Sequence, residues 1–260
     1  MSDRINFPSG FGMKDLVAYG NTGMVLLDKD TDMVIKSPHD EKSAVALTKE
    51  QQIYERFVQR CGHKSILCYH GTFESGIRLE YASHGNIRSY LDDHPADEAR
   101  RMRRLDVKLA DFAGSSLDGS PLLIGVTPSH EYPGPLLSIE ADLFALGYTL
   151  YEIVNESQPY AGLSDEVILD HYSKGKFPET GSLGSVGSII TKCWRGEYKE
   201  CKQVVCDLKV KAARQRLLAS SSHNNILPAT YTPVYSDLFV AIVVVVAVSA
   251  LIIKRSPGGG

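Results

Sequence analysis

The stretch Val107–Gly114, which reads Val-Lys-Leu-Ala-Asp-Phe-Ala-Gly, decides how this 260-residue chain is expected to fold. Strand-forming residues lead into Asp111, and an aromatic residue and two small residues follow it. A strand that delivers a carboxylate to a tight turn places a hard oxygen ligand where a divalent cation could be held against a phosphate. A solvated turn aspartate gives the same pattern, so the stretch alone leaves both interpretations open.

Composition is ordinary for a globular protein, with 43% hydrophobic and 23% charged residues. The net charge of -3 argues against nucleic acid as a partner, because a phosphate footprint needs a basic excess. The first fifteen residues lack an apolar core, so no signal peptide is expected. The cysteines have no C-x-x-C spacing, which predicts reduced, buried thiols in a reducing compartment. They are Cys61, Cys68, Cys193, Cys201 and Cys206.

The first eighty residues predict an antiparallel sheet with one helix against it. Short apolar runs alternate with glycine-containing or charged turns, which is the pattern of strands and hairpins. The expected strands are a hairpin over 15–25 and the runs 25–27, 33–36, 66–73 and 77–81. Helical spacing over 43–60 predicts a helix whose apolar face comprises Val45, Leu47, Ile53, Tyr54, Phe57 and Val58.

The second half predicts helices. A short helix over 86–92 precedes a polar stretch with four arginines (Arg100, Arg101, Arg103 and Arg104), which could be a solvated face or an anion site. The expected later helices are 141–154, 165–173, 188–194 and 201–217. The fold class is therefore α+β, with a β-rich lobe followed by a helical lobe.

The C-terminal region predicts a linker over 219–237 and a hydrophobic segment over 238–253. At about 1.5 Å per residue, an apolar helix of this length spans roughly 24 Å, slightly less than a usual bilayer core. A buried strand is the alternative, but the chain printed here holds no later domain to bury one. We expect a tail anchor that leaves the preceding lobes in the cytoplasm; a wholly cytoplasmic protein is the alternative.

A glycine-containing turn precedes a lysine and a glutamate at suggestive spacing. Gly20 and Gly23 flank Asn-Thr, and glycines let backbone amides approach phosphate oxygens, although such a turn is often only a turn. The strand that follows ends at Lys36, and Glu50 lies fourteen residues later on the expected helix. A lysine held by a glutamate could be aimed at nucleotide phosphates; a surface ion pair is the alternative.

Together, these features resemble the protein kinase family in order and in spacing. The loop G-x-G-x-x-G-x-V matches at Gly20, Gly23 and Val25, with Ala18 in place of the first glycine. Asp111-Phe112-Ala113 stands where the family has D-F-G. Weaker matches are Ser129-His130-Glu131 for A-P-E, Asp142–Gly147 for the buried central helix, and Lys192-Cys193-Trp194.

The resemblance implies a two-lobe protein kinase-like fold with residues 11–91 as the small lobe and hinge and 92–218 as a shortened large lobe. It implies ATP and Mg²⁺ as cofactors, with Asp111 as the metal ligand. By the same resemblance, the nucleotide-binding residues would be Gly20, Gly23, Val25, Lys36, Glu50, the gatekeeper Leu79, and the hinge residues Glu80 and Ala82.

One departure from the family limits the functional prediction. Leu91 and Asp111 lie only twenty positions apart, and the residues between them contain no H-R-D-x-x-x-x-N catalytic loop, so no catalytic residue is assigned. By family, the chain would transfer a phosphoryl group from ATP to a protein Ser/Thr or Tyr hydroxyl. The alternatives are a catalytically inactive, membrane-tethered pseudokinase scaffold that binds nucleotide, and an incomplete gene product.

Overall fold

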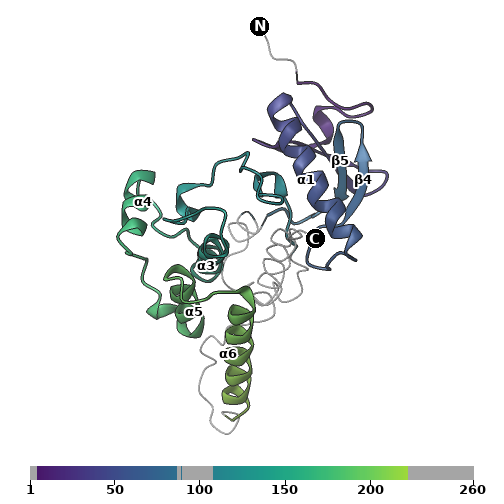
Figure 1. Ribbon diagram of the computed structural model, residues 1–260. Coiled ribbons are helices and arrows are strands. Elements are labelled where there is room, and N and C mark those ends of the chain that lie inside the picture. The colour runs from purple at the N-terminus through teal and green to yellow at the C-terminus, as the bar shows by residue number, and fades with distance from the viewer. Residues whose placement is uncertain (1–4, 87–88, 90–107, 222–260) are drawn as a thin grey trace, which may run out of the picture. The chain divides into compact units, whose positions relative to one another are not determined.

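The computed structural model describes residues 5–86, 89 and 108–221 (Figure 1). They form two compact units: one comprises 5–84 and 108–125, and the other 85–86, 89 and 126–221. The predicted lobe boundary at 91–92, the arginine-containing stretch, most of the expected helix over 86–92, and the segments 222–237 and 238–253 lie outside the described residues. These predictions therefore stay predictions.

The first unit contains a five-stranded sheet in which every pairing is antiparallel, with the order β1-β2-β3-β5-β4. The strands are β1 (Leu16–Gly20), β2 (Gly23–Asp28), β3 (Met33–Ser37), β4 (Tyr69–Phe73) and β5 (Gly76–Glu80). One face of β2 and β3 buries Met24, Leu26 and Ile35 against side chains that include Phe7 and Phe11. The predicted α+β class is confirmed.

Helix α1 (Glu41–Gln59) begins two residues before the predicted start, because Asp40 caps it. The Asp40 carboxylate accepts a hydrogen bond from the Ser43 amide at 2.6 Å, which satisfies an amide that the first turn leaves free. The predicted apolar face is partly wrong: Val45 and Val58 are 59% and 58% exposed, and the face is centred on buried residues such as Tyr54.

The chain returns to the sheet unit at Lys108. Leu109 forms a parallel bridge with Ile66, in which its amide donates to the Ser65 carbonyl at 2.7 Å and its carbonyl accepts from the Leu67 amide at 2.9 Å. The predicted strand over 66–73 is therefore too long: β4 begins at Tyr69, and Ile66 pairs with the returning chain instead. The bridge places the segment that follows within the sheet unit.

The second unit is helical (Figure 1). Its main helices are α3 (Ile139–Asn155), α4 (Asp165–Ser173), α5 (Gly184–Trp194) and α6 (Cys201–Ser221). Helix α5 begins four residues before the predicted start, at Gly184, and buries Val186 in its first turn. Helix α3 packs on α5 at Gly147, where an added Cβ would lie 2.8 Å from Cys193 Cβ. The glycine therefore permits this close approach.

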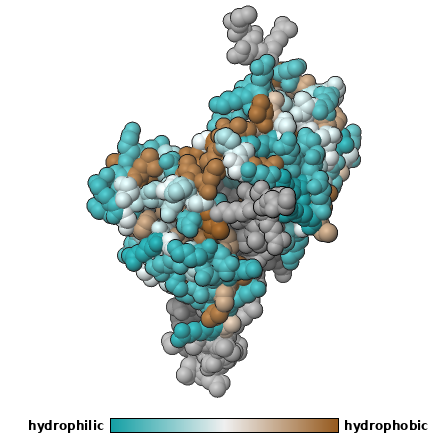
Figure 2. Space-filling view, viewed as in Figure 1, coloured by the Kyte–Doolittle hydropathy of each residue, from teal (hydrophilic) through white to brown (hydrophobic). Residues whose placement is uncertain are grey.

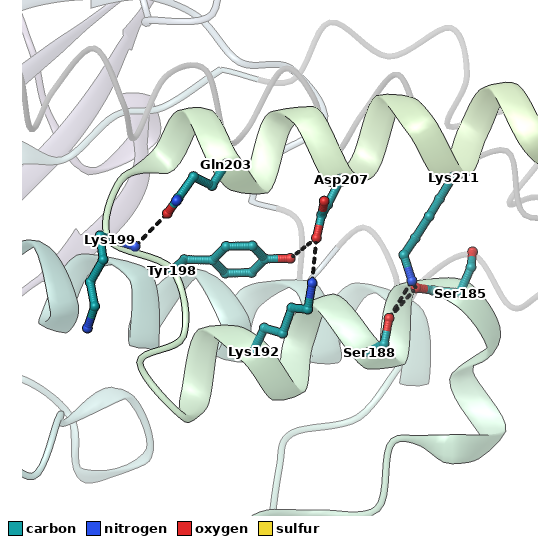
Figure 3. Close-up of polar contacts among 8 residues, drawn as sticks. All are labelled: Ser185, Ser188, Lys192, Tyr198, Lys199, Gln203, Asp207 and Lys211. Atoms are coloured by element: carbon teal, nitrogen blue, oxygen red, sulfur yellow. Dashed lines mark hydrogen bonds and ion pairs between the residues drawn. The ribbon is translucent and has the colours of Figure 1, made fainter.

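Polar contacts join α5 to α6 (Figure 3). The Asp207 carboxylate accepts from Lys192 Nζ at 2.9 Å and from the Tyr198 hydroxyl at 2.7 Å. Lys211 Nζ donates to the Ser185 carbonyl at 2.7 Å, and it also contacts the Ser188 hydroxyl. These contacts fix the pairing of the two helices beside the apolar core that they share.

All five cysteines are free thiols, but the predicted burial holds only for Cys193 and Cys201. Cys61, Cys68 and Cys206 are exposed. Hydrophilic residues cover much of the face drawn in Figure 2, with apolar residues between them. Among the helices of the described ranges, none combines the length and the hydropathy that a membrane span requires.

Candidate functional site

Lys36 is the centre of a buried polar group in the sheet unit. Its Nζ donates to Glu50 Oε2 at 2.7 Å and to Asp111 Oδ1 at 2.6 Å. The lysine side chain is only 7% exposed. Two carboxylates therefore balance the charge of a largely desolvated ammonium, which would otherwise be costly to bury. Three residues that the sequence predicted to act together are brought together.

The sheet register places further predicted residues on the face that carries Lys36. Val25 pairs directly with Lys36, and Leu79 pairs with Val34, which lies two positions before Lys36 on β3. Directly opposed residues, and residues two apart on one strand, project to the same face of a sheet. Val25, Lys36 and Leu79 therefore share the face against which Glu50 presents its carboxylate.

Glu50 is fully buried on α1, with an exposed fraction of 0%. Burial raises the pKa of its carboxyl, and the neighbouring Lys36 opposes that rise. Its second oxygen, Oε1, makes no hydrogen bond with the described residues. Lys36 is thus the main group that compensates the charge of Glu50, and removing the lysine would leave a buried, unpaired carboxylate.

Asp111 combines an anchored backbone with an accessible side chain. It adopts the left-handed conformation, with φ 63° and ψ 64°, directly before the short 3₁₀ helix η4 (Phe112–Gly114). Phe112 is buried and packs edge-on against Tyr54, with ring centroids 5.1 Å apart. The Asp111 side chain is nevertheless 64% exposed. A carboxylate, the kind of group that a hard cation prefers, is therefore anchored through its backbone and open to solvent.

The β1–β2 turn contains the two predicted glycines, and they differ in what they require. Gly23 has φ +137°, and an added Cβ would collide with the Ser37 carbonyl, so glycine is needed there to build the hairpin. Gly20 is exposed, and a Cβ there would meet no atom within 4 Å. The fold therefore does not require glycine at position 20.

The two predicted hinge residues, Glu80 and Ala82, lie at the end of β5 and shortly after it. Lys108 Nζ donates to both carboxylate oxygens of Glu80 at 2.7 Å. Burial alone would raise the pKa of Glu80, but the bonds from Lys108 and the Cys68 amide lower it below its usual value. The Glu80 side chain thus ties β5 to the returning chain. Ala82 lies in an exposed segment after β5.

The residues present are compatible with a nucleotide and Mg²⁺. The ammonium of Lys36 suits a phosphate oxygen, and the accessible carboxylate of Asp111 suits a divalent cation. The described residues contain no group of three or more His, Cys, Asp or Glu side chains that could hold a metal by themselves. Magnesium commonly binds one or two carboxylates and takes its other ligands from water and substrate phosphates, so one aspartate is sufficient.

Sequence reasoning missed two ion pairs of this unit, Lys108–Glu80 and Arg56–Asp118. Their partners lie 28 and 62 positions apart. No motif links either pair, because each pair joins segments that meet only in the folded chain. The sequence therefore held no signal for them.

The weaker motifs lie in the helical unit. His130 ends η5 (Pro128–His130), with its ring centroid 3.7 Å from that of Tyr148 on α3. Burial lowers the pKa of His130 to about 4. The Tyr172 hydroxyl donates to the Ser129 carbonyl at 3.2 Å, which joins α4 to the same segment. The predicted A-P-E counterpart is thus part of the packing of this unit.

No protein-family model matches the chain. It is 23% identical over 191 residues to NUAK family SNF1-like kinase 2 of Rattus norvegicus, covering 54% of this chain and 29% of that protein. The human protein of that name is 22% identical over 191 residues, which again cover 54% of this chain and 29% of that protein. Serine/threonine-protein kinase mos of Patiria pectinifera is 23% identical over 141 residues, covering 48% of this chain and 40% of that protein.

The aligned regions cover less than half the length of each of these relatives. The 191 aligned positions also occupy only 54% of the 260 residues here, so the rat relative has positions within the aligned region that this chain lacks.

Proposed function

We propose that this chain, which carries a protein kinase-like domain, binds ATP with Mg²⁺ at Lys36, Glu50 and Asp111, and transfers its phosphoryl group poorly. The observation that carries the proposal is the arrangement around Lys36 Nζ, 2.7 Å from Glu50 and 2.6 Å from Asp111. These residues belong to one compact unit.

Each residue has a separate part in this proposal. Lys36 donates to a phosphate oxygen, and Glu50 orients the lysine through the 2.7 Å contact between them. Asp111 contributes a carboxylate oxygen to the metal, whose charge offsets that of the phosphates. Val25 and Leu79, on the same sheet face, supply apolar contact for the base.

The same chain lacks the groups that phosphoryl transfer requires in this family. The residues between Leu91 and Asp111 include no His-x-Asp triplet and no asparagine. One positioned acid–base group contributes about 10²–10⁴-fold to a rate, and a second metal ligand is lost with it. We therefore favour a nucleotide-binding pseudokinase over an active enzyme.

Phosphoryl transfer to a protein hydroxyl is the second candidate function. The relatives favour it, since all of them are kinases by name and one is a serine/threonine-protein kinase. Efficient phosphoryl transfer would need the catalytic segment from another form of the gene product.

The localisation proposal rests on sequence alone. We propose that residues 238–253 anchor the chain in a membrane and leave the kinase-like region in the cytoplasm. Alkaline carbonate extraction of the full chain, beside a version ending at Ser236, tests the anchor. Equal extraction of both would contradict it. Asn155-Glu156-Ser157 is a glycosylation sequon, so glycosylation at Asn155 would contradict the orientation.

Nucleotide-dependent thermal stabilisation of the full chain tests the proposed function. A ligand present at 100 times its Kd stabilises the folded state by about 2.7 kcal/mol, which would raise Tm by several degrees. We expect the rise with ATP and Mg²⁺ and a smaller one with ATP and a chelator. An unchanged Tm in both would contradict binding and favour an incomplete product.

A further inference from the structure

The ten residues after Asp111 contact α1 on two of its faces. On the inner face, Phe112 packs against Tyr54 and Phe57, with ring centroids 5.1 and 5.4 Å apart. On the outer face, Arg56 donates to both carboxylate oxygens of Asp118, each at 2.6 Å. Lys49 Nζ also donates to the Pro121 carbonyl at 2.6 Å, so the segment is held along the helix.

The Arg56–Asp118 contact has the geometry of a strong ion pair. Two parallel hydrogen bonds fix the orientation of both planar groups, unlike a single lysine contact. The pair lowers the pKa of Asp118 and raises that of Arg56. Both side chains remain partly exposed, so screening by solvent and salt limits the strength of the pair.

The turn that carries Asp118 is built to present it. Asp118 has φ 53°, and Gly119 beside it has φ 79°, so the turn uses the left-handed region twice. The Ser116 hydroxyl donates to the Ser120 carbonyl at 2.7 Å, and the Ser120 hydroxyl accepts from the Leu117 amide at 3.0 Å. These bonds hold the turn closed, and a non-glycine residue in this conformation persists only where its surroundings impose it.

The position of α1 determines whether Glu50 reaches Lys36. Helix α1 packs more extensively on η4 than on any single strand, so the segment after Asp111 does much to set where the helix lies. Arg56 and Glu50 lie on one continuous helix and therefore move together. A shift of α1 away from Asp118 would also withdraw Glu50 from its place beside the lysine.

We propose that Arg56 and Asp118 are positioning residues whose ion pair latches α1 onto the segment after Asp111 and so sets the affinity of the Lys36 site for nucleotide. This proposal rests on the proposed function. Neither residue belongs to the Lys36 group itself, so the pair acts through Glu50 and Asp111. Breaking it weakens binding without removing any group that contacts the ligand.

A double-mutant cycle on the full chain tests the latch. The variants are Arg56→Gln, Asp118→Asn, which keeps a residue type that tolerates the left-handed region, and the two combined. We expect each single variant to weaken binding of ATP with Mg²⁺ about three- to tenfold, and the double variant to be no weaker than either. Arg56→Lys keeps the charge but loses the guanidinium group that makes two parallel hydrogen bonds. Its affinity for ATP with Mg²⁺ should lie between those of wild type and Arg56→Gln.

Lys42→Gln is the matched control, because it removes one cation from an exposed position of α1 whose charge acts on Asp40 and not on Asp118. Its affinity should equal that of wild type. Unchanged affinity in both single variants, or fully additive losses in the double variant, would overturn the latch.

Hydrogen exchange separates failure of the latch from failure of the proposed function. Amides over 112–120 should exchange faster in Arg56→Gln and Asp118→Asn than in wild type and Lys42→Gln, with or without nucleotide. If wild type binds no ATP, the proposed function is wrong. Hydrogen exchange alone then tests whether the Arg56–Asp118 pair holds the segment after Asp111 on α1. Unchanged exchange in both variants would overturn the latch.

Discussion

Asp111 Oδ1 accepts a hydrogen bond from Lys36 Nζ across 2.6 Å, although the two residues lie 75 positions apart in the chain. The contact exists because the chain returns to the sheet unit at Lys108 and bridges Ile66 through Leu109. The carboxylate and the ammonium therefore meet despite the short connection from residue 85 to residue 107. The contact between Lys36 and Asp111 therefore forms in a chain that has no H-R-D-x-x-x-x-N motif between Leu91 and Asp111.

Asp111→Asn should reduce the dependence of ATP binding on Mg²⁺. The substitution keeps the shape of the side chain and removes the charge that attracts the metal, and a charge-assisted contact contributes about 1–3 kcal/mol. We expect ATP affinity to differ between Mg²⁺ and chelator in wild type, and much less in the variant. Asp30→Asn, in an exposed turn, is the control. An unchanged Mg²⁺ effect in Asp111→Asn would place the metal elsewhere.

The chain should phosphorylate protein substrates very weakly. The residues before Asp111 lack the catalytic aspartate and the metal-binding asparagine of the kinase family, and positioning without them leaves little catalysis. Transfer of labelled phosphate to a mixture of generic protein substrates measures this. Robust transfer that Asp111→Ala abolishes would show that the shortened segment supplies a catalytic group after all.

Gly147→Ala should destabilise the helical unit by about 1–3 kcal/mol, the usual cost of overpacking a core. The new methyl group would lie 2.8 Å from Cys193 Cβ and 3.1 Å from the Trp194 ring, so α3 and α5 would have to separate. Urea unfolding measures the change in the free energy of unfolding. Gly125→Ala, which meets no atom within 4 Å, is the control. Equal stability of Gly147→Ala and wild type would contradict this packing.

His130 should make the helical unit less stable as pH falls below 6.5. Burial lowers its folded pKa to about 4, so between pH 6.5 and 4 the unfolded chain binds a proton that the folded chain excludes. Stability is therefore retained above the unfolded pKa and lost on acidification, by about 2 kcal/mol at pH 5. Urea unfolding of wild type and His130→Gln at pH 7 and pH 5 measures this. An equal acid loss in the variant would assign it to other groups.

Local patterning was sufficient to predict the sheet and most helices. Alternating apolar residues and turn residues predicted β2, β3 and β5, and helical periodicity predicted α1 and α3. Helix α1 starts two residues before the predicted position, because the Asp40 carboxylate caps it by accepting a hydrogen bond from the Ser43 amide. The region over 66–73 was predicted as a single strand because local periodicity says nothing about its partners.

The candidate site was predictable only in part. Lys36 and Glu50 lie close in the chain, and strand-to-helix spacing predicted their contact. That Asp111 joins them depends on the long-range return of the chain, and only the family resemblance indicated it. The Lys108–Glu80 and Arg56–Asp118 pairs had no local signal, since each forms between segments that meet only after the chain has folded.

Direct titration of the full chain with ATP and Mg²⁺ tests the central claim most directly, by comparing wild type with Lys36→Ala and with Lys29→Ala, which alters an exposed turn lysine. Losing one charge-assisted contact to phosphate weakens binding by about 1–3 kcal/mol. We expect a roughly 5- to 150-fold higher Kd for Lys36→Ala and an unchanged Kd for Lys29→Ala. Equal affinity in all three proteins would contradict a nucleotide site at Lys36.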